Sequence, residues 1–488
     1  MTRFLKQTSV EMGSETARRL FFEVLGHVDP NVVGPRLGRL RVQGRKDLET
    51  PNFVAVSSRG VVPHISPDVL VTSTQVRGVH MALEDCKLLL GHVSPSCFES
   101  NKSPVIEKTT PPIMNSPGSP LHTFTALPSS IVTLLAPRRT PAVTAPNGNS
   151  NTAISIFTST GFQVLSNKSY IETIRKLRPD IGIGLADIPY SATPGTKRID
   201  KMGDRTQEWL SQLINEKDEE QAIFAPVLPI EFQSQSEYLN HVADDLAPDI
   251  SGLAFYDSNL LPDIPATTSL SKLPRLSLDE PKSPHHILRQ ISLGMDVFTI
   301  PFIGFATDAG IAFTFRFPRP LPDDNAEPST IGTRTATLGI DMWTPTHATS
   351  LTPLSTSCTC YTCTSHHRAY IQHLLSAKEM LGWVLIQIHN YHILCEFFAS
   401  IRESIRDGRF ESDAEEFGRI YESELPEKSG QGPRVRGYHF KTEGPGEPKK
   451  NKVAWGNLGS DDQMDEGLVP GEDGGELEEK GFAEKADT

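Results

Sequence analysis

The feature that most narrows the possible folds is an alternation of short apolar segments with amphipathic ones between residues 165 and 303. Strand-like segments read IGIGLAD, SGLAFYD and MDVFTIPF, and helix-like segments read SNKSYIETIRKL, GDRTQEWLSQLINEK and SPHHILRQISLG. In the first helix-like segment, Tyr170, Ile171, Ile174 and Leu177 recur at helical spacing. Alternation of this kind predicts a parallel α/β architecture.

Length and composition frame this architecture. A chain of 488 residues can form two or three domains, or a single α/β barrel with long insertions. Only 37% of its residues are hydrophobic, and 38 prolines and 36 glycines favour irregular segments. We expect strands and hairpins at 34–75, a long surface loop at 95–150 and loop-like structure at 320–350. The resulting expectation is a folded body at 1–428 and a disordered acidic tail at 429–488.

The net charge of −13 is concentrated in that tail. Residues 460–488 contain eleven acidic residues and only two lysines, Lys480 and Lys485. The charge of the remaining chain is therefore close to balanced, and it neither indicates nor excludes a nucleic-acid partner.

No targeting or membrane segment stands out. The N-terminal residues lack the apolar core of a signal peptide, and the most apolar stretch, 296–315, is interrupted by Asp296, Pro301 and Asp308. We expect that stretch to form two buried strands joined by a turn. Six cysteines in the whole chain do not form a secreted disulfide framework, so we expect a cytosolic, reducing environment.

Three of the six cysteines lie in the hexapeptide CTCYTC, as Cys358, Cys360 and Cys363. Thiolates this close repel one another unless a metal ion gathers them, and zinc does so at about 2.3 Å from each sulfur. His389 lies on the apolar stripe of a predicted helix and is a candidate fourth ligand, whereas His366 is the alternative. A Cys3His site has no open position, so we expect one structural zinc ion per chain. Two helices, separated near Gly382, should follow the cysteines.

The cysteine cluster also carries a family resemblance. CTCYTC, followed after 26 residues by His389 and Asn390, resembles the zinc site of tRNA-guanine transglycosylases. Matching segments occur in the same order in LETPNFVAVSSRGVVPHISPDVL, in the stretch from 166 to 210 and in LPRLSLDEPKSPHHILRQISLGMDVF. The resemblance covers roughly residues 34 to 410. It implies a (β/α)8 TIM-type barrel with a zinc subdomain at 351–406, inserted near the last strand.

Departures from the family pattern indicate lost catalysis. The family's reaction exchanges guanine through a covalent bond between ribose and a carboxylate, and the position of that nucleophile holds Thr299. Asp296 lies at an odd offset and is expected to face away. The family's second catalytic aspartate corresponds to Thr158 in TSTGFQ. The resemblance assigns base recognition to Asp187, for which a capping role after a strand is an equal alternative, and it leaves no catalytic residue.

A family member with a zinc pattern and without a nucleophile resembles the non-catalytic subunit of the eukaryotic queuine-inserting enzyme. That resemblance implies a heterodimer with a catalytic paralogue, a role in tRNA positioning, and tRNA as a partner. It also implies a cytoplasmic location, with peripheral association with the mitochondrial outer membrane as a second place. Two other functions compete with this one: a self-sufficient base-exchange enzyme with a different nucleophile, and a zinc scaffold unrelated to tRNA.

Overall fold

The computed structural model describes residues 20–433, apart from 26–33, 59, 87–112, 114–115, 117, 146–147, 159–160, 191–192, 266–267 and 320–334. Almost all of the predicted acidic tail lies outside these residues, so its disorder and the domain boundary at 428 stay predictions.

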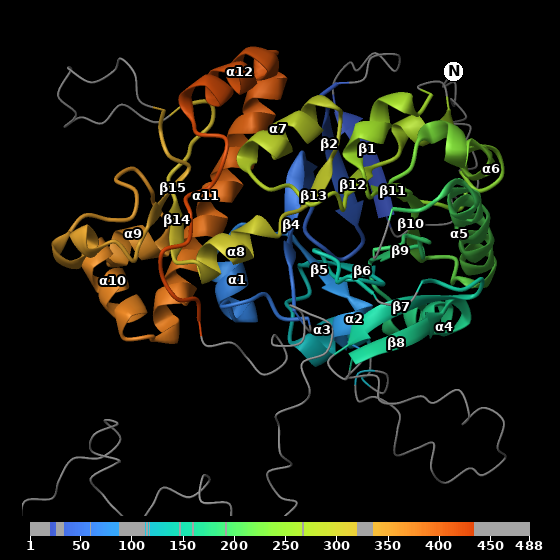
Figure 1. Cartoon of the computed structure of the whole chain (residues 1–488), viewed down its shortest axis with the longest axis horizontal. Coiled ribbons are helices and arrows are strands. Elements are labelled where there is room, and N and C mark those ends of the chain that lie inside the picture. The colour runs from blue at the N-terminus through green and yellow to red at the C-terminus, as the bar shows by residue number, and fades with distance from the viewer. Residues whose placement is uncertain are drawn as a thin grey trace, which may run out of the picture. The chain divides into compact units, whose positions relative to one another are not determined.

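Eight parallel strands close into a barrel (Figure 1). The seam is closed where the last strand pairs with the first, with Thr299 opposite Val54. This arrangement confirms the predicted parallel α/β architecture and the (β/α)8 barrel. In chain order the barrel strands are β4 (Asn52–Val56), β5 (Gly78–Ala82), β6 (Val132–Ala136), β9 (Ile181–Ile183), β10 (Ala222–Val227), β11 (Gly252–Phe255), β12 (Arg275–Ser277) and β13 (Val297–Thr299).

Alternate residues of these strands belong to two cores. Val54, Leu134 and Phe224 pack together in the barrel interior, whereas their neighbours in sequence pack against the surrounding helices. The interior is tight at Gly252, because a Cβ atom there would lie 2.5 Å from the Phe224 ring. Only glycine therefore fits at that position of β11.

Amphipathic helices cover the outside of the barrel. In α4 (Asn167–Leu177), the Ser166 hydroxyl accepts a hydrogen bond from the Ser169 backbone N–H, which caps the first turn. The apolar face of α4 is buried, and the helix ends where Arg178 adopts a left-handed conformation with φ 48°. The other helices around the barrel are α1 (Pro67–Ser73), α2 (Leu83–Cys86), α3 (Pro120–Thr125), α5 (Thr196–Glu216), α6 (Ser236–Asp244), α7 (Pro284–Ser292), α8 (Phe302–Asp308), α11 (Met380–Arg406) and α12 (Phe410–Ile420).

Three antiparallel sheets accompany the barrel in the described residues, and one of them pairs β14 (Ile311–Phe313) with β15 (Gly339–Asp341). β1 (Leu20–Leu25), β2 (Leu37–Val42) and β3 (Leu48–Thr50) form a small sheet whose buried residues join the interior core. β7 (Ala153–Thr158) and β8 (Gly161–Ser166) form a hairpin between β6 and α4.

The loop expected at 95–150 is a wrong prediction for its described part. This part contains the helix α3 and the barrel strand β6, whose five residues are all buried. The strand VTLLA is short and stands between Pro- and Ser-rich segments, which masked it in the sequence. The expected loop at 320–350 contains β15 (Gly339–Asp341) and a short 3-10 helix (Pro345–Thr349) in its described residues.

Of two further predictions, only the first needs correction. The stretch 296–315 forms a strand, the helix α8 and β14 (Ile311–Phe313), not two strands joined by a turn. The break between the late helices lies at 377–379, because Lys378 takes a left-handed conformation with φ 57°. Gly382 lies inside α11, where a Cβ atom would meet the Leu375 side chain at 3.1 Å. This glycine permits close packing of α11 on its neighbour and does not end a helix.

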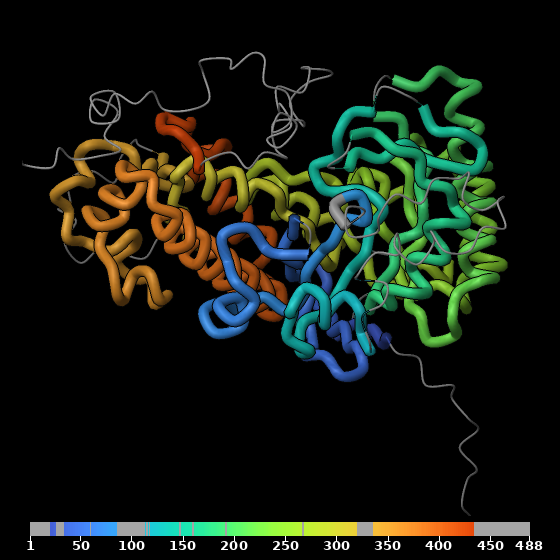
Figure 2. Tube along the Cα trace, turned by 90° about the horizontal axis from the view of Figure 1, so that it is seen from below, coloured from blue at the N-terminus to red at the C-terminus, as the bar shows by residue number. Residues whose placement is uncertain are grey.

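The segment after β14 forms a subdomain at one end of the folded body, seen in orange in Figures 1 and 2. It contains β15, α9 (Tyr361–Ser365), α10 (Arg368–Ser376) and the start of α11. Leu354, Ile371 and Trp383 belong to its small apolar core. Among the described helices, none combines the length and the apolar character needed to span a bilayer.

Candidate functional site

The four predicted metal ligands meet at one point of this subdomain. The Nδ1 atom of His389 lies 3.6 Å from the sulfur of Cys358, 3.5 Å from that of Cys360 and 3.4 Å from that of Cys363. All four donor atoms lie within 4.8 Å of one another. The structure therefore forms a Cys3His group that could hold a metal ion.

Local structure positions each of these ligands. Cys360 caps α9, and its sulfur accepts a hydrogen bond from the Cys363 backbone N–H at 3.4 Å. His389 is fully buried in α11, and its Nε2 atom lies 2.8 Å from the carbonyl oxygen of Phe313. A proton on Nε2 leaves Nδ1 as a free electron-pair donor facing the sulfurs. The alternative ligand His366 instead stacks on Tyr370, with ring centroids 5.2 Å apart.

The donor set fits tetrahedral zinc. Bond lengths of about 2.3 Å to sulfur and 2.0–2.1 Å to nitrogen place sulfur and nitrogen about 3.6 Å apart at a tetrahedral angle. The three sulfur–nitrogen distances agree with that value. With four protein ligands and no open position, such a centre would hold the subdomain together and would not activate water.

Thr299, at the expected nucleophile position, is fully buried at the end of β13. Its hydroxyl donates a hydrogen bond to the Ser277 carbonyl oxygen at 3.1 Å. The proton of the hydroxyl is thus bound to a backbone acceptor, which cannot take it up as a general base would.

Asp296 cannot replace the missing nucleophile. It precedes β13, at the end of the barrel opposite to the one where active sites of this fold lie. Its carboxylate is fully buried and accepts hydrogen bonds from Arg36 Nε at 2.9 Å and from the Arg275 backbone N–H at 2.8 Å. Asp296 is part of a buried ion pair that ties the segment before β2 to the barrel.

Thr158, the second altered position, ends β7. Its hydroxyl donates to the carbonyl oxygen of Gly161, the first residue of β8, at 2.9 Å. The described residues of TSTGFQ, Thr158 and 161–163, therefore belong to the β7–β8 hairpin, and Phe162 packs on Phe157 with ring centroids 4.8 Å apart.

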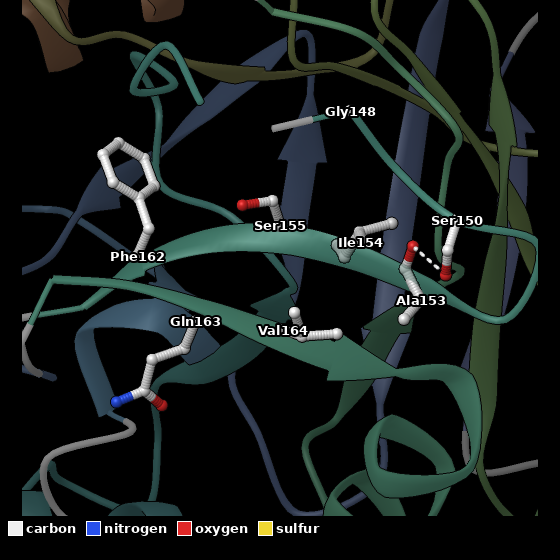
Figure 3. Close-up of a pocket in the computed structure, with 8 residues that line it drawn as sticks. All are labelled: Gly148, Ser150, Ala153, Ile154, Ser155, Phe162, Gln163 and Val164. Carbon is white, nitrogen blue, oxygen red and sulfur yellow. Dashed lines mark hydrogen bonds between the residues drawn. The ribbon is translucent and has the colours of Figure 1, made fainter. Parts of the chain in front are cut away.

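A shallow hollow of about 100 Å³ lies on the hairpin (Figure 3). The Phe162 ring and the Ser155 hydroxyl project on one side of the hairpin, and the Gln163 side chain projects on the other. The Ser150 hydroxyl, which donates to the Ala153 carbonyl oxygen at 3.3 Å, lies at the far end. The hollow is too small to enclose a nucleobase with its sugar, because ligand pockets usually measure about 300–1,000 Å³.

Asp187 follows β9 at the barrel mouth and is fully buried. Its carboxylate forms ion pairs with Arg198 and with Arg205, the latter at 3.0 Å, and accepts a hydrogen bond from Asn149 Nδ2 at 2.7 Å. The backbone N–H of Asp187 donates to the Thr206 hydroxyl at 3.1 Å. The carboxylate is the centre of an internal ion-pair network rather than a cap after a strand, and base recognition by Asp187 stays a prediction.

Neither arginine was singled out in the sequence. A signal was present, because Arg198 and Arg205 are seven residues apart in α5 and therefore lie on the same face of the helix. A second missed group is Glu84, which is buried and pairs with Arg139 at 2.9 Å. Glu84 also accepts a hydrogen bond from the Phe157 backbone N–H at 3.0 Å and so holds β7 in place.

A small apolar cluster lies beyond the carboxyl ends of β9 and β10, beside the start of α5. The Arg138 guanidinium lies 4.6 Å from the centre of the Tyr190 ring, which packs against this cluster. Burial raises the pKa of the Tyr190 hydroxyl to about 12, against the opposing effect of Arg138. The cluster consists of Ala186, Ile188, Met202, Leu228 and Ile230, with Tyr190, Ile199 and Tyr256 packed against it.

Comparison with known proteins agrees with this geometry. Residues 32–423 match the family model described as queuine tRNA-ribosyltransferase. The chain has a parallel barrel and a Cys3His group beside the last barrel strand, and the family model matches most of its length. It therefore belongs to the queuine tRNA-ribosyltransferase family.

The individual relatives point to one branch of the family. The Schizosaccharomyces pombe protein named queuine tRNA-ribosyltransferase accessory subunit 2 is 37% identical over 431 residues, which cover 86% of this chain and 89% of that protein. The proteins of the same name from Drosophila grimshawi and Drosophila melanogaster are each 26% identical, over 389 and 393 residues. Both alignments cover 76% of this chain and 86% of the relative.

Proposed function

We propose that this chain is the non-catalytic accessory subunit of a heterodimeric queuine tRNA-ribosyltransferase. Its catalytic partner exchanges guanine for queuine at the wobble position of the tRNA anticodon, and this chain helps to position the tRNA. The observation that carries the proposal is that both carboxylate positions of the family's reaction hold threonines whose hydroxyls bond to backbone carbonyls, Thr299 and Thr158. The names of the curated relatives support the accessory role.

The metal of the Cys3His group is zinc in this proposal. Three sulfur ligands and one imidazole are a common ligand set of structural zinc sites, and the sulfur–nitrogen distances match tetrahedral geometry. In this role zinc would fix α9 against α11 and stabilise the fold of the subdomain.

The zinc subdomain also offers a surface for the partner. Four large apolar side chains are exposed there: Leu351 (76%), Tyr361 (52%), Leu381 (43%) and Met380 (41%). Exposed apolar side chains gathered on one part of a protein commonly mark contacts with another protein. We therefore propose that the catalytic subunit covers part of this subdomain.

The location is a separate proposal. We propose a cytoplasmic protein, with peripheral association with the mitochondrial outer membrane as the second place that the family resemblance implies. Cell fractionation with and without the catalytic subunit tests both places.

The decisive experiment measures guanine exchange into tRNA. We expect no exchange by this chain alone, little by the catalytic subunit alone and full exchange by the two together. Exchange by this chain alone would favour the alternative of a self-sufficient enzyme with a different nucleophile. A catalytic subunit that works equally well without this chain would contradict the accessory role.

The zinc subdomain can be tested in the same assay. Cys360→Ser removes a proposed ligand, and Cys395→Ser removes a buried free thiol outside the cluster. Only the first substitution should lower zinc content and weaken association with the partner.

A further inference from the structure

The carboxylate of Asp187 is saturated by donors from its own chain. Oδ1 accepts from Arg198 Nη2 and Asn149 Nδ2, and Oδ2 accepts from Arg198 Nη1 at 2.5 Å and Arg205 Nη1 at 3.0 Å. A carboxylate offers about four lone-pair sites. Four N–H groups therefore leave no acceptor site for a ligand.

The saturated carboxylate lies at a place in the barrel where a ligand would otherwise be expected. Asp187 follows a barrel strand at its carboxyl end, where ligands bind in barrels of this fold. A buried carboxylate at this place would be suited to receive the N–H donors of a purine-like base. In this chain the bidentate guanidinium of Arg198 presents two parallel donors to it instead.

The residues on both sides of Asp187 are also packed. Its neighbours Ala186 and Ile188 belong to an apolar cluster with Leu228. The Arg138 side chain lies over Tyr190 and donates to the Ile188 carbonyl oxygen at 3.4 Å. These contacts hold the loop that carries Asp187 with the protein's own side chains.

The same network fixes a loop. Arg205 donates from Nε at 3.0 Å and from Nη2 at 2.6 Å to Asn151 Oδ1, and from Nη1 to the Asn149 carbonyl oxygen at 3.3 Å. Trp209 Nε1 donates to the Asn151 carbonyl oxygen at 2.8 Å. Asp187 thus holds residues 149–151, which lead into the β7–β8 hairpin, against α5.

We propose that Arg198 and Arg205 act as an internal plug that takes the donor positions of a base at Asp187. The barrel mouth of this chain is then closed to nucleobases, and Asp187 is a positioning residue for the loop at 149–151. This inference rests on the proposed function and extends it: the heterodimer binds queuine or guanine at a single site, which belongs to the catalytic partner.

The test counts bound base. Calorimetric titration with queuine should give no binding to this chain alone and a single equivalent per heterodimer. Two equivalents per heterodimer, or binding to the unaltered chain alone, would overturn the plug. Size-exclusion chromatography shows first whether the heterodimer forms. If the heterodimer does not form, the proposed function is contradicted. The titration of this chain alone still tests whether Arg198 and Arg205 prevent base binding.

A substitution makes the test specific. Arg198→Ala frees two of the four acceptor sites but leaves Arg205 to balance the charge of Asp187, so the carboxylate is not left unpaired. We expect saturation transfer from this variant to free guanine by NMR, and none from wild type. The matched control is Arg175→Ala, which removes an exposed arginine paired with Asp218 and should give no transfer. No transfer from Arg198→Ala would contradict the assignment of the plug to this arginine.

The role in positioning has its own readout. Asp187→Asn should increase hydrogen exchange of the amides at 148–155 more than the general loss of stability increases it in α7, on another part of the barrel. An increase at 148–155 no larger than that in α7 would refute the positioning role.

Discussion

The imidazole Nε2 of His389 lies 2.8 Å from the carbonyl oxygen of Phe313, so α11 and β14 jointly orient the fourth proposed metal ligand. The neighbouring Asn390 extends this connection, because its side chain receives the Phe313 backbone N–H at 2.9 Å and donates to the Ile311 carbonyl oxygen at 3.0 Å. His389 and Asn390 therefore attach β14 to α11 at both ends of the strand, Ile311 and Phe313. The Cys3His group is built on this attachment.

Loss of the metal should unfold the subdomain before the barrel. Chelation or Cys360→Ser removes the attraction that offsets the mutual repulsion of three buried thiolates, and structural zinc contributes several kcal/mol or more to folding. We expect loss of bound zinc and a lower first transition in calorimetry, while Cys395→Ser keeps its zinc. His389→Ala should also lose zinc. Zinc retained by this variant would shift the fourth ligand to His366.

Asp187→Asn should destabilise the fold strongly. The substitution leaves two arginines without a buried counter-charge, and breaking a buried pair in this way costs about 3–5 kcal/mol. Asp218→Asn is the control, because its partner Arg175 is exposed and such surface pairs contribute about 1 kcal/mol or less. Urea unfolding measures both free energies. Equal effects of the two substitutions would contradict a structural role for the network.

Thr299→Asp should not create an exchange enzyme. The second carboxylate position remains Thr158, and the introduced carboxylate would be buried beside the Ser277 carbonyl oxygen, an acceptor that repels it. We expect no guanine exchange and a lower melting temperature. Appreciable turnover by this single variant would show that one carboxylate is enough.

His80 should make the protein sensitive to mild acid. Burial lowers the pKa of this imidazole to about 4, from 6.5 for an exposed histidine, and neither ring nitrogen has a hydrogen-bond partner among the described residues. Between pH 6.5 and 4 the unfolded chain binds a proton that the folded chain does not. The free energy of unfolding therefore falls as the pH falls, by up to about 1.4 kcal/mol per pH unit and about 3 kcal/mol in total.

The His80→Leu variant isolates this effect. In His80→Leu the free energy of unfolding should fall less as the pH falls, and the variant should be more stable than wild type at pH 5. In His286→Gln, which alters an exposed histidine, the free energy of unfolding should change with pH as it does in wild type. Urea unfolding at pH 7 and pH 5 gives the comparison. A parallel fall in wild type and His80→Leu would assign the acid sensitivity to other groups.

The sequence predicted those parts of the fold in which local pattern and tertiary structure agree. The helix at 167–177 combines a serine cap with four buried apolar residues at helical spacing, so its position could be deduced directly. The spacing of the cysteines likewise predicted a cluster that the structure brings together. In both cases the signal lies within a few neighbouring residues.

Other signals have more than one physical cause. The break between α10 and α11 lies near Gly382, as predicted, but this glycine itself lies inside α11 and allows the two helices to approach closely. The role of Asp187 could not be chosen from sequence, because its partners Asn149, Arg198 and Arg205 lie 38, 11 and 18 residues away. Only the folded barrel brings these groups to one carboxylate.

The long helix α11 connects the Cys3His group with the barrel. It has 27 residues and is therefore about 40 Å long. Its first half carries His389, and its second half places Phe398 against Phe53 of β4, with ring centroids 5.5 Å apart. This helix thus runs from the Cys3His group to β4, one of the two strands between which the barrel closes. A protein that binds at the cysteine end of α11 would therefore act on β4 through one continuous helix.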